Sequence, residues 1–386
     1  MTESRLKEYI DINPKVKLQK GEKYSSVEME KITVGQKVAD ANNKAEYTGK
    51  SCSKFLPNDT LMARITPCLE NGKIAKYESD TAGFGSTEFF VLRAKENKVT
   101  ADYVYYLSQT HYIRQLAVNS MTGASGRQRA DAKYIGNIKW NFPDIEIQIK
   151  IADILSAYDN LIENNNKRIH LLEQMAENFY KEWFVRFRFP GYEDVDFENG
   201  IPKGWKIVRL SDIADIIMGQ SPESENYNTN CKGLPFHQGV GSYGDFYLID
   251  DVYSTKGNRI AEANSIIFSV RAPVGRINIT LNKIILGRGV AGINSILGYN
   301  AYLLWMLKNQ FQQEDIIGNG SIFASVTKKE LFGFKILMPN ENLMQKFDSI
   351  ASGIESEMRK ISLINSNLKK QRDMLLPRLM SGKLEV

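Results

Sequence analysis

Two stretches of the chain, 196 residues apart, share one pattern of apolar and polar positions. Each begins with a short apolar run, GNIKWNF up to Phe142 and GFKILM up to Met338, and a proline follows. Proline lacks a backbone donor, so each run is predicted to end as a strand at Pro143 or Pro339. The next residue is Asp144 or Asn340, and both types are favoured as N-caps. A helix is therefore predicted to begin at each junction.

After each junction the apolar period changes to 3.5, in alternating steps of four and three residues. Sustained steps of this kind are typical of the a/d seam of a coiled coil, although an amphipathic helix on a globular core is the alternative. The seam of the first helix contains Ile151, Leu155, Tyr158, Ile162, Asn165, Ile169, Leu172, Ala176, Phe179 and Trp183. The seam of the second contains Phe347, Ala351, Ile354, Met358, Ile361, Asn365, Leu368, Arg372, Leu375 and Leu379.

Each seam contains one asparagine. Asn165 is the fifth of ten seam positions in its helix, and Asn365 is the sixth of ten in the other. An antiparallel pair places the two amides opposite each other, whereas a parallel pair in register places each amide opposite an isoleucine. A buried amide without a hydrogen-bond partner is costly, so we predict an antiparallel coiled coil in which Asn165 lies beside Asn365.

A looser repetition precedes each helix. Residues 59–75 and 264–279 both show a strand, a basic residue, a proline turn, a glycine and a second strand. Residues 101–109 and 300–310 both show a helical pattern rich in aromatic residues, and a loop of small residues follows each, at 122–129 and 318–323. The aromatic side chains recur at helical spacing, which favours core packing over base stacking. Pro377 is expected to kink or end the second helix, with no matching break at Lys181.

These patterns predict an α+β fold with two mixed α/β domains in tandem, each followed by a long helix. The two helices would form an antiparallel intramolecular coiled coil with pseudo-two-fold symmetry. The predicted parts are an N-terminal domain (1–143), a central helix with a linker (144–190), a C-terminal domain (191–339) and a distal helix (340–386).

Composition adds broad limits. A chain of 386 residues is too long for one compact core, and 42% hydrophobic with 25% charged residues is ordinary for a globular protein. The three cysteines form no C-x-x-C pair, and no apolar run has the length of a membrane span. We therefore expect a reduced, cytoplasmic protein with no membrane partner. The net charge of +5 is compatible with a polyanion partner without requiring one.

Basic and amide side chains near the proline turns and the small-residue loops are the candidate DNA contacts. Arginine and glutamine can form paired hydrogen bonds with guanine and adenine edges, whereas lysine more often contacts phosphate. For each residue the alternative is a solvated surface position. The candidates in the first domain are Arg64, Lys73, Arg127, Gln128, Arg129 and Lys133, and those in the second are Arg259, Arg271, Arg276, Arg288, Lys328 and Lys329.

Motifs of catalysis are missing from the sequence. There is no G-x-x-x-x-G-K-S/T phosphate loop and no H-E-x-x-H, and the three histidines are not clustered. Asn141 to Asp144 reads NFPD, which lacks the second proline and the aromatic residue of an amino-methyltransferase Asn-Pro-Pro-Tyr loop. We therefore predict no catalytic residue and no metal site in this chain.

Several segments, taken in order, resemble the specificity subunits of type I restriction–modification systems. The resemblance covers essentially the whole chain, but the first domain lacks the Pro-x-Gly-Trp found at Pro202 to Trp205. That departure favours two recognition domains of different subtypes. The segments are LMARITPCLENGKIA, FPDIEIQIKIADIL, IPKGWKIVRLSDIADIIMGQSP, MPNENLMQKFDSIA and LLPRLMSGKLEV.

This resemblance implies a non-catalytic subunit whose two domains each read half of a split site in double-stranded DNA. The helices would set the spacer and dock two methyltransferase subunits, which methylate adenine N6 with S-adenosylmethionine. Motor-nuclease subunits that use ATP and Mg²⁺ would join through the complex, and no cofactor is expected in this chain. Two alternatives stay open: recognition domains of a methyltransferase or nuclease enzyme, and a coiled-coil scaffold with no DNA role.

Overall fold

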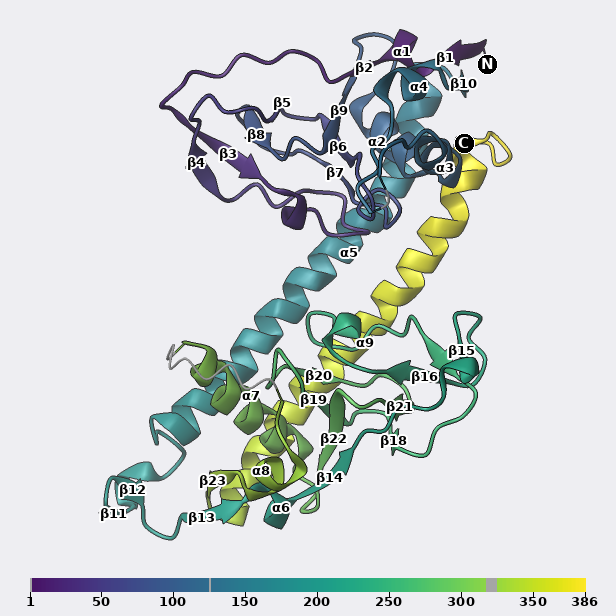
Figure 1. Ribbon diagram of the computed structural model, residues 1–386. Helices are drawn as coiled ribbons and strands as arrows, with labels where there is room; N and C mark the ends of the chain where they lie inside the picture. Colours follow the sequence, from purple (N-terminus) through teal and green to yellow (C-terminus); the bar gives the residue numbers. More distant parts are fainter. Residues whose placement is uncertain (1, 125, 317–324) are drawn as a thin grey trace. The chain divides into compact units, whose positions relative to one another are not determined.

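The computed structural model describes residues 2–124, 126–316 and 325–386, and it divides into two compact units. Unit 1 comprises Met1–Asn166 and Leu363–Val386, and unit 2 comprises Lys167–Ser362. The division crosses both long helices, α5 (Ile145–Tyr180) and α9 (Glu341–Met380). Each unit therefore holds one globular domain together with a segment of each long helix (Figure 1).

Unit 1 contains two four-stranded sheets. The first has the strand order β2-β9-β6-β7, and its strands are β2 (Ile10–Ile12), β6 (Thr60–Ala63), β7 (Ile74–Lys76) and β9 (Phe89–Ala94). The second has the order β4-β3-β8-β5, with β3 and β8 parallel, and its strands are β3 (Lys23–Val27), β4 (Lys44–Glu46), β5 (Ser53–Phe55) and β8 (Gly83–Gly85).

The remaining elements of unit 1 are one further pair of strands and several short helices. Strands β1 (Thr2–Arg5) and β10 (Lys139–Phe142) pair antiparallel just before α5 begins. The short helices are α1 (Leu6–Tyr9), η1 (Met29–Lys31), α2 (Ala101–Gln109), α3 (His111–Asn119) and α4 (Ala132–Asn137). Thr100 caps α2 and Asp131 caps α4, because each side chain accepts a hydrogen bond from a backbone N–H of the first turn.

Unit 2 repeats this plan. One sheet has the order β14-β22-β19-β20, with β14 (Ala214–Met218), β19 (Ile266–Ser269), β20 (Ile277–Ile279) and β22 (Val290–Ser295). The other has the order β15-β17-β16-β21-β18, with β15 (Tyr227–Asn228), β16 (Leu234–His237), β17 (Tyr253–Ser254), β18 (Ile260–Ala261) and β21 (Ile284–Leu286). Strands β16 and β21 are parallel, as are β3 and β8.

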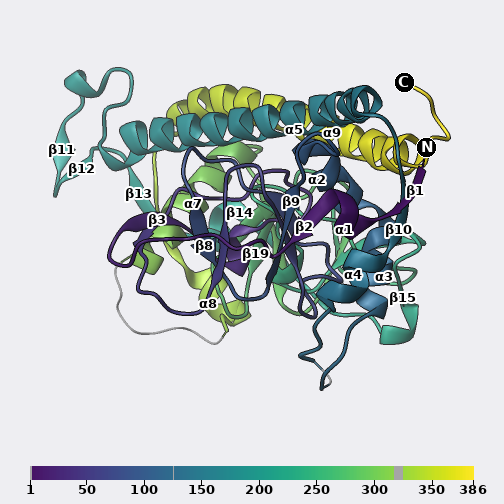
Figure 2. The ribbon, with the colours of Figure 1, turned by 90° about the horizontal axis from the view of Figure 1, so that it is seen from above.

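The other elements of unit 2 also correspond. Strands β13 (Lys206–Arg209) and β23 (Lys335–Met338) pair antiparallel, and β11 (Phe197–Glu198) pairs with β12 (Ile201–Pro202). The helices are η2 (Lys181–Val185), η3 (Tyr192–Asp194), α6 (Leu210–Ile213), η4 (Ser224–Asn226), η5 (Val240–Ser242), α7 (Asn300–Ile316) and α8 (Lys328–Gly333). In the view of Figure 2, the globular part of each unit lies on one side of its helical segments.

The duplication extends to the domain openings. The order β1-α1-β2 in unit 1 recurs as β13-α6-β14 in unit 2, and in both units the first strand pairs with the strand that precedes the long helix. The first domain therefore contains the same opening elements as the second, although it lacks the Pro-x-Gly-Trp sequence. The two domains differ in sequence at this point, but the order and pairing of their opening strands are the same.

Each unit has its own apolar core around the aromatic helix. In unit 1 the α2 side chains Tyr103, Tyr105 and Tyr106 are at most 2% exposed, and in unit 2 the α7 side chains Tyr302 and Trp305 are equally buried. The prediction that these aromatic residues pack in the core is confirmed. An aromatic side chain buries about 150–250 Å² of surface, so these residues contribute strongly to the stability of each domain.

The two long helices end in different ways. Helix α9 continues through Pro377 to Met380, because a proline in the last turn removes only one backbone hydrogen bond. At Lys181, the counterpart of Pro377, the helix passes directly into the π-helix η2, so the chain stays helical through Val185. The wider turn accompanies the burial of two adjacent rings, Trp183 and Phe184. Among the described residues, no helix combines the length and apolarity that a membrane span needs.

Candidate nucleic-acid interface

In unit 1 the predicted contact loop is held against the turn that follows β6. The Thr66 N–H donates to the Gln128 carbonyl at 3.0 Å, and the Ala130 N–H donates to the Arg64 carbonyl at 2.8 Å. The Gln128 N–H also donates to the Thr66 hydroxyl at 3.1 Å. The fold thus brings together polar side chains that are about 60 residues apart in sequence. The connection between α3 and α4 projects on the side of unit 1 opposite α5 (Figure 2).

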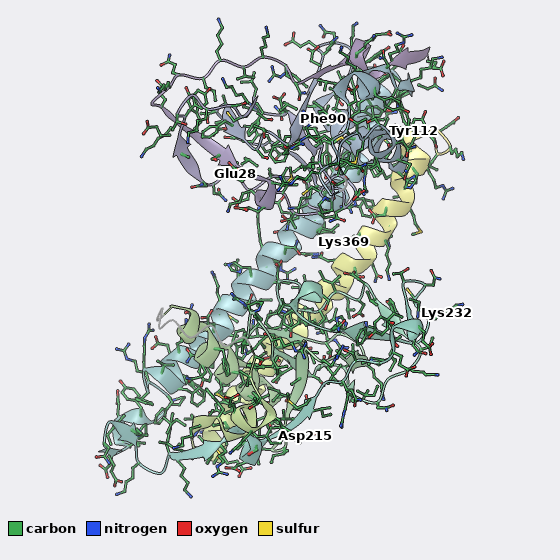
Figure 3. The ribbon with its side chains drawn as sticks, viewed as in Figure 1. Glu28, Phe90, Tyr112, Asp215, Lys232 and Lys369 are labelled. Carbon is green, nitrogen blue, oxygen red and sulfur yellow. The ribbon has the colours of Figure 1, made fainter. Side chains whose placement is uncertain are left out.

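Three of the six candidates in unit 1 also hold the fold together. Arg129 forms a two-pronged pair with Glu88, with NH2 to Oε1 at 2.6 Å and Nε to Oε2 at 2.9 Å, and this carboxylate raises the pKa of Arg129. Lys73 Nζ donates to the Met29 carbonyl at 2.9 Å. The Arg64 guanidinium lies 5.2 Å from the ring centroid of Phe90, which is inside the domain (Figure 3).

The other three candidates in unit 1 present their side chains to solvent. Arg127 and Lys133 are exposed, and Gln128 is half-exposed. Their side chains make no hydrogen bond or ion pair with the described part of the chain. These three residues are therefore the ones whose donors are available for bases or phosphates. Lys133 lies in the first turn of α4, twelve residues before α5 begins at Ile145.

Unit 2 joins the same two segments. The Val326 N–H donates to the Val270 carbonyl at 2.8 Å, and Arg271 forms a bridge with Ser325, as Ile65 does with Arg129 in unit 1. Arg271 therefore occupies the second position after β19, the strand that leads into the proline turn. The predicted loop at 318–323 lies outside the described residues, so only its flanks are placed.

The other candidates of unit 2 lie in connections between strands and at the start of α8. Arg259, Arg276 and Arg288 are exposed, and the backbone N–H groups of Arg276 and Arg288 donate to Ser269 and Ser221. Lys328 and Lys329 are exposed in the first turn of α8, where the Lys328 ammonium lies 5.0 Å from the Phe332 ring centroid. The Ser269 N–H donates to the Arg276 carbonyl and the Val270 N–H donates to the Gly289 carbonyl, both at 2.9 Å, so Arg271, Arg276 and Arg288 flank the end of β19.

The helical segments of unit 1 pair in opposite directions. Asn165 Nδ2 donates to Asn365 Oδ1 at 2.8 Å, and Asn365 Nδ2 donates to Asn166 Oδ1 at 2.8 Å. Both seam asparagines are 5% exposed. Toward the start of α5, Asp159 meets Arg372, further along α9. The predicted antiparallel contact between Asn165 and Asn365 is confirmed.

The helical segments of unit 2 are also antiparallel. Phe179 of α5 stacks on Phe347 of α9 with ring centroids 5.7 Å apart, and Arg168 pairs with Glu357 at 3.5 Å. As residue numbers rise along α5, the partner numbers fall along α9. The seam predicted from the 3.5-residue period is buried or half-buried at every position in both helices.

Comparisons with known proteins agree with this architecture. The sequence model of the family described as "Type I restriction modification DNA specificity domain" matches residues 1–174 and 202–371. The chain belongs to this family. Within the family, it is similar to a putative type I restriction enzyme MjaX specificity subunit of Methanocaldococcus jannaschii, with 31% identity covering 86% of this chain and 80% of that protein.

Two further similarities extend over nearly the whole chain. The type I restriction enzyme HindI specificity subunit of Haemophilus influenzae is 23% identical, over 89% of this chain and 90% of that protein. The crystal structure of the type I restriction–modification S subunit from M. genitalium has a TM-score of 0.53, with 16% identity over 98% of this chain and 95% of that chain. That structural likeness concerns the fold.

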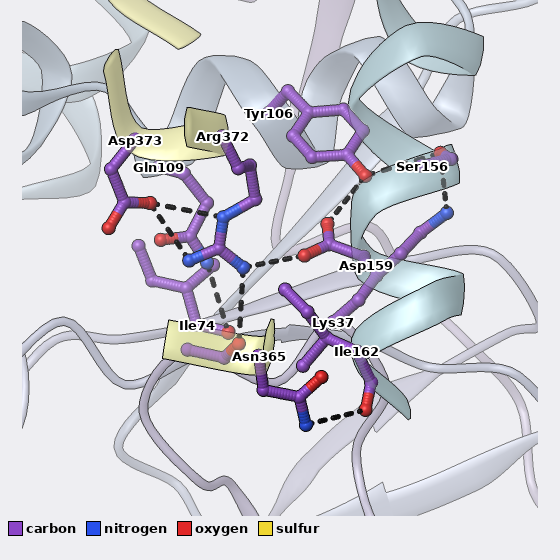
Figure 4. A network of polar contacts seen from close by, with 11 residues as sticks. Lys37, Ile74, Tyr106, Gln109, Ser156, Asp159, Ile162, Asn365, Arg372 and Asp373 are labelled. Atoms are coloured by element: carbon purple, nitrogen blue, oxygen red, sulfur yellow. Dashed lines mark hydrogen bonds and ion pairs between the residues drawn. The ribbon is translucent and has the colours of Figure 1, made fainter. Parts of the chain in front are cut away.

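A buried polar network supports the recognition domain of unit 1. We call Asp159, Arg372, Tyr106, Ser156 and Lys37 the Asp159 network (Figure 4). Arg372 NH1 donates to Asp159 Oδ1 at 2.5 Å, and the Tyr106 hydroxyl donates to Asp159 Oδ2 at 2.6 Å. Lys37 Nζ donates to the Ser156 hydroxyl at 3.0 Å and pairs with Asp102 at 2.8 Å. The globular domain is thus bonded to α5, and α5 to α9.

Burial perturbs the titration of this network. Desolvation acts to lower the pKa of Arg372, but the adjacent Asp159 and Asp373 carboxylates raise it by more. Burial raises the pKa of Tyr106 far above its usual range, and the Asp159 charge raises it further. At neutral pH the arrangement is a guanidinium and a phenol, both protonated, that share one carboxylate.

The equivalent place in unit 2 has different chemistry. Trp305 Nε1 donates to Glu355 Oε1 at 3.0 Å, at the positions that correspond to Tyr106 and Asp159. Burial raises the pKa of Glu355 to about 8, so its carboxyl group is mostly protonated at neutral pH. The nearby Lys308 instead pairs with Glu173 at 2.5 Å.

His237 is a buried histidine of unit 2 that sequence reasoning left unassigned. Its ring nitrogens lie 2.7 Å from the Ser242 hydroxyl and 2.9 Å from the Asp250 carboxylate. Asn282 also donates to Asp250, at 2.7 Å, so these side chains hold the η5 loop to its neighbours. Among the described residues, no group of three or more His, Cys, Asp and Glu could hold a metal ion.

Sequence reasoning missed Glu88, Thr66 and the Asp159–Arg372 pair. Glu88 lies 41 residues from Arg129, and no local pattern links them. Arg372 was visible as the one basic residue in the second seam, which could have indicated a buried acid on the opposite helix. Asp159, however, lies next to the seam position Tyr158 and not in the seam, so the 3.5-residue period did not predict that it is buried.

Proposed function

We propose that this specificity subunit reads a split site in double-stranded DNA, one half with each globular domain. The observation that supports this best is the repeated strand turn with a contact segment bonded across it, at Thr66 and Gln128 in unit 1 and at Arg271 and Ser325 in unit 2. Exposed arginine and glutamine side chains at such a turn suit the edges of bases in a major groove. The antiparallel helices would set the number of base pairs between the two half-sites.

We propose further that the chain catalyses no reaction by itself. The sequence lacks motifs for binding nucleotides or activating water, and the family is described by DNA specificity. Two methyltransferase subunits would bind S-adenosylmethionine and flip an adenine out of the DNA duplex for N6 methylation. Motor-nuclease subunits would supply ATP and Mg²⁺, and the assembly would act on DNA in the cytoplasm.

Exposed apolar side chains on the long helices support docking of the methyltransferase subunits. Their side chains are 37–63% exposed, unlike those of the seam, and they provide apolar surface that a docked subunit would cover. They are Ile149, Ile154, Leu161, Leu363, Ile364 and Met374 in unit 1, and Leu171, Met175 and Ile350 in unit 2.

The test is co-expression with the cognate methyltransferase, followed by genome-wide mapping of N6-methyladenine. We expect a split motif with two unequal halves and a constant spacer. A single uninterrupted motif, or no motif, would contradict the proposal. The purified chain alone, incubated with DNA, Mg²⁺ and S-adenosylmethionine, should neither cleave nor methylate; either activity would favour the enzyme alternative.

A scaffold without a DNA role would behave differently in a binding assay. DNA affinity of the assembled complex should fall steeply with salt, because each phosphate contact releases counterions. Negligible affinity that is independent of salt would favour the scaffold.

A further inference from the structure

One carboxylate joins three separate parts of unit 1. Asp159 of α5 accepts from Arg372 of α9 and from Tyr106 of α2. Arg372 also donates to the Gly35 carbonyl at 3.3 Å, in the segment that follows η1. The same two side chains that pair the helices therefore also seat the recognition domain on them (Figure 4).

Burial makes this pair selective for one helix register. The Asp159 side chain is 4% exposed and that of Arg372 is 12% exposed. The neighbouring seam positions of α9 are Leu368 and Leu375, so a slip of one seam step in either direction would place a leucine against Asp159. A buried carboxylate that has lost its partner is strongly destabilising, so a slip of one seam step in either direction is penalised.

The second unit has no equivalent pair among its described residues. The helices repeat with an offset of 196 residues, so Asp159 corresponds to Glu355 and Arg372 corresponds to Ala176, which is fully buried. Glu355 receives a hydrogen bond from Trp305, and Lys308 pairs with Glu173. The second domain is therefore held to its helical segments by these two contacts and by apolar packing around Phe347, without a counterpart of the Asp159–Arg372 pair.

We propose that Asp159 and Arg372 are positioning residues for the recognition domain of unit 1. Their pair sets the register of α9 on α5 and the position of the domain on both helices. The number of base pairs between the half-site read by this domain and the other half-site then depends on the pair. This inference rests on the proposed reading of a split DNA site.

The test uses the full chain in complex with its methyltransferase. The principal variant is the double substitution Asp159→Asn and Arg372→Met. The introduced amide still accepts from Tyr106 and the introduced thioether side chain fills the seam, and replacing a buried ion pair by groups of similar volume is often neutral for stability. We expect an assembled complex with unchanged half-site bases. Its preference for the native spacer over spacers one base pair longer or shorter should fall by about tenfold.

Two further variants separate positioning from mere stability. Arg372→Lys keeps the charge and should retain most of the spacer preference. This variant tests the inference even if the double variant proves poorly folded. Glu355→Gln, the matched change in unit 2, should leave the spacer unchanged, because the native carboxyl group is mostly protonated at neutral pH.

The inference is overturned if the folded double variant keeps a spacer preference within about twofold of the native chain. Altered half-site bases would also overturn it, since the pair would then affect reading rather than positioning. A native complex that shows no split motif would instead overturn the proposed function, and the two failures are therefore distinguishable.

Discussion

Asn165 donates a 2.8 Å hydrogen bond to Asn365 in the buried seam of unit 1. The Asn365 amide also donates to Asn166, so both ends of that side chain are satisfied. This contact identifies the helices as antiparallel and marks one register, because no neighbouring seam position carries an amide.

Removing one asparagine should destabilise the coiled coil more than removing both. Asn365→Leu leaves the Asn165 amide buried without its acceptor, at a cost of about 1–3 kcal/mol in the free energy of unfolding. The double variant with Asn165→Leu should regain that loss, because leucines fill an apolar seam. Urea unfolding followed by circular dichroism measures both, and equal midpoints for the single and double variants would contradict the prediction.

Arg127 and Arg129 should affect DNA binding differently. Arg127 is exposed without an ion pair in the described part of the chain, so Arg127→Ala should weaken binding and, if it contacts a phosphate, reduce the salt slope by about 1. Arg129 is paired with Glu88, so Arg129→Ala should also lower the thermal midpoint of the free chain. Fluorescence anisotropy at several salt concentrations and a melting curve test both. A larger stability loss for Arg127→Ala would refute the assignment.

Glu355 should make stability depend on pH. Its pKa is raised from 4.5 to about 8, so the folded chain keeps a proton that the unfolded chain has released between these values. Stability is therefore fully present below pH 4.5 and is lost as pH rises toward 8. Glu355→Gln should remove this loss and be more stable than the native chain by about 2 kcal/mol at pH 8, about half the full linkage value because solvent partly screens this half-buried side chain.

The pH prediction is checked by urea midpoints at about pH 5 and about pH 8. The gain from Glu355→Gln should be clearly larger at the higher pH. The exposed Glu385 provides a control, since Glu385→Gln should give the same small change at both pH values. A gain from Glu355→Gln that is equal at both would show that the carboxyl group is not retaining a proton.

Lengthening both helices should lengthen the spacer. One heptad inserted after Asn166 in α5 and one after Ser362 in α9 keeps the 3.5-residue seam matched. Seven residues add about 10 Å at 1.5 Å per residue, which corresponds to about three base pairs at 3.4 Å each. Methylation mapping should show the same half-site bases with the longer spacer. Changed bases at an unchanged spacer would refute the role of the helices.

Much of the architecture could be predicted from the sequence, because it follows from local periods. The 3.5-residue spacing defined both seams, and one asparagine in each allowed a single antiparallel match between Asn165 and Asn365. The proline junctions marked where each strand ends and each helix begins, near Pro143 and Pro339. The seam period and the proline junctions depend only on neighbouring residues and backbone chemistry, so they can be recognised without knowledge of the fold.

Only the tertiary structure decided which polar side chains are engaged. Arg127 and Arg129 are two similar residues of one loop. Only Arg129 pairs with Glu88, which lies 41 residues away in sequence. Asp159 and Arg372 are 213 residues apart, and their pairing depends on burial by a third element that carries Tyr106. The energy of a charge depends on its distance to other charges and on the water removed around it, and both are properties of the folded chain.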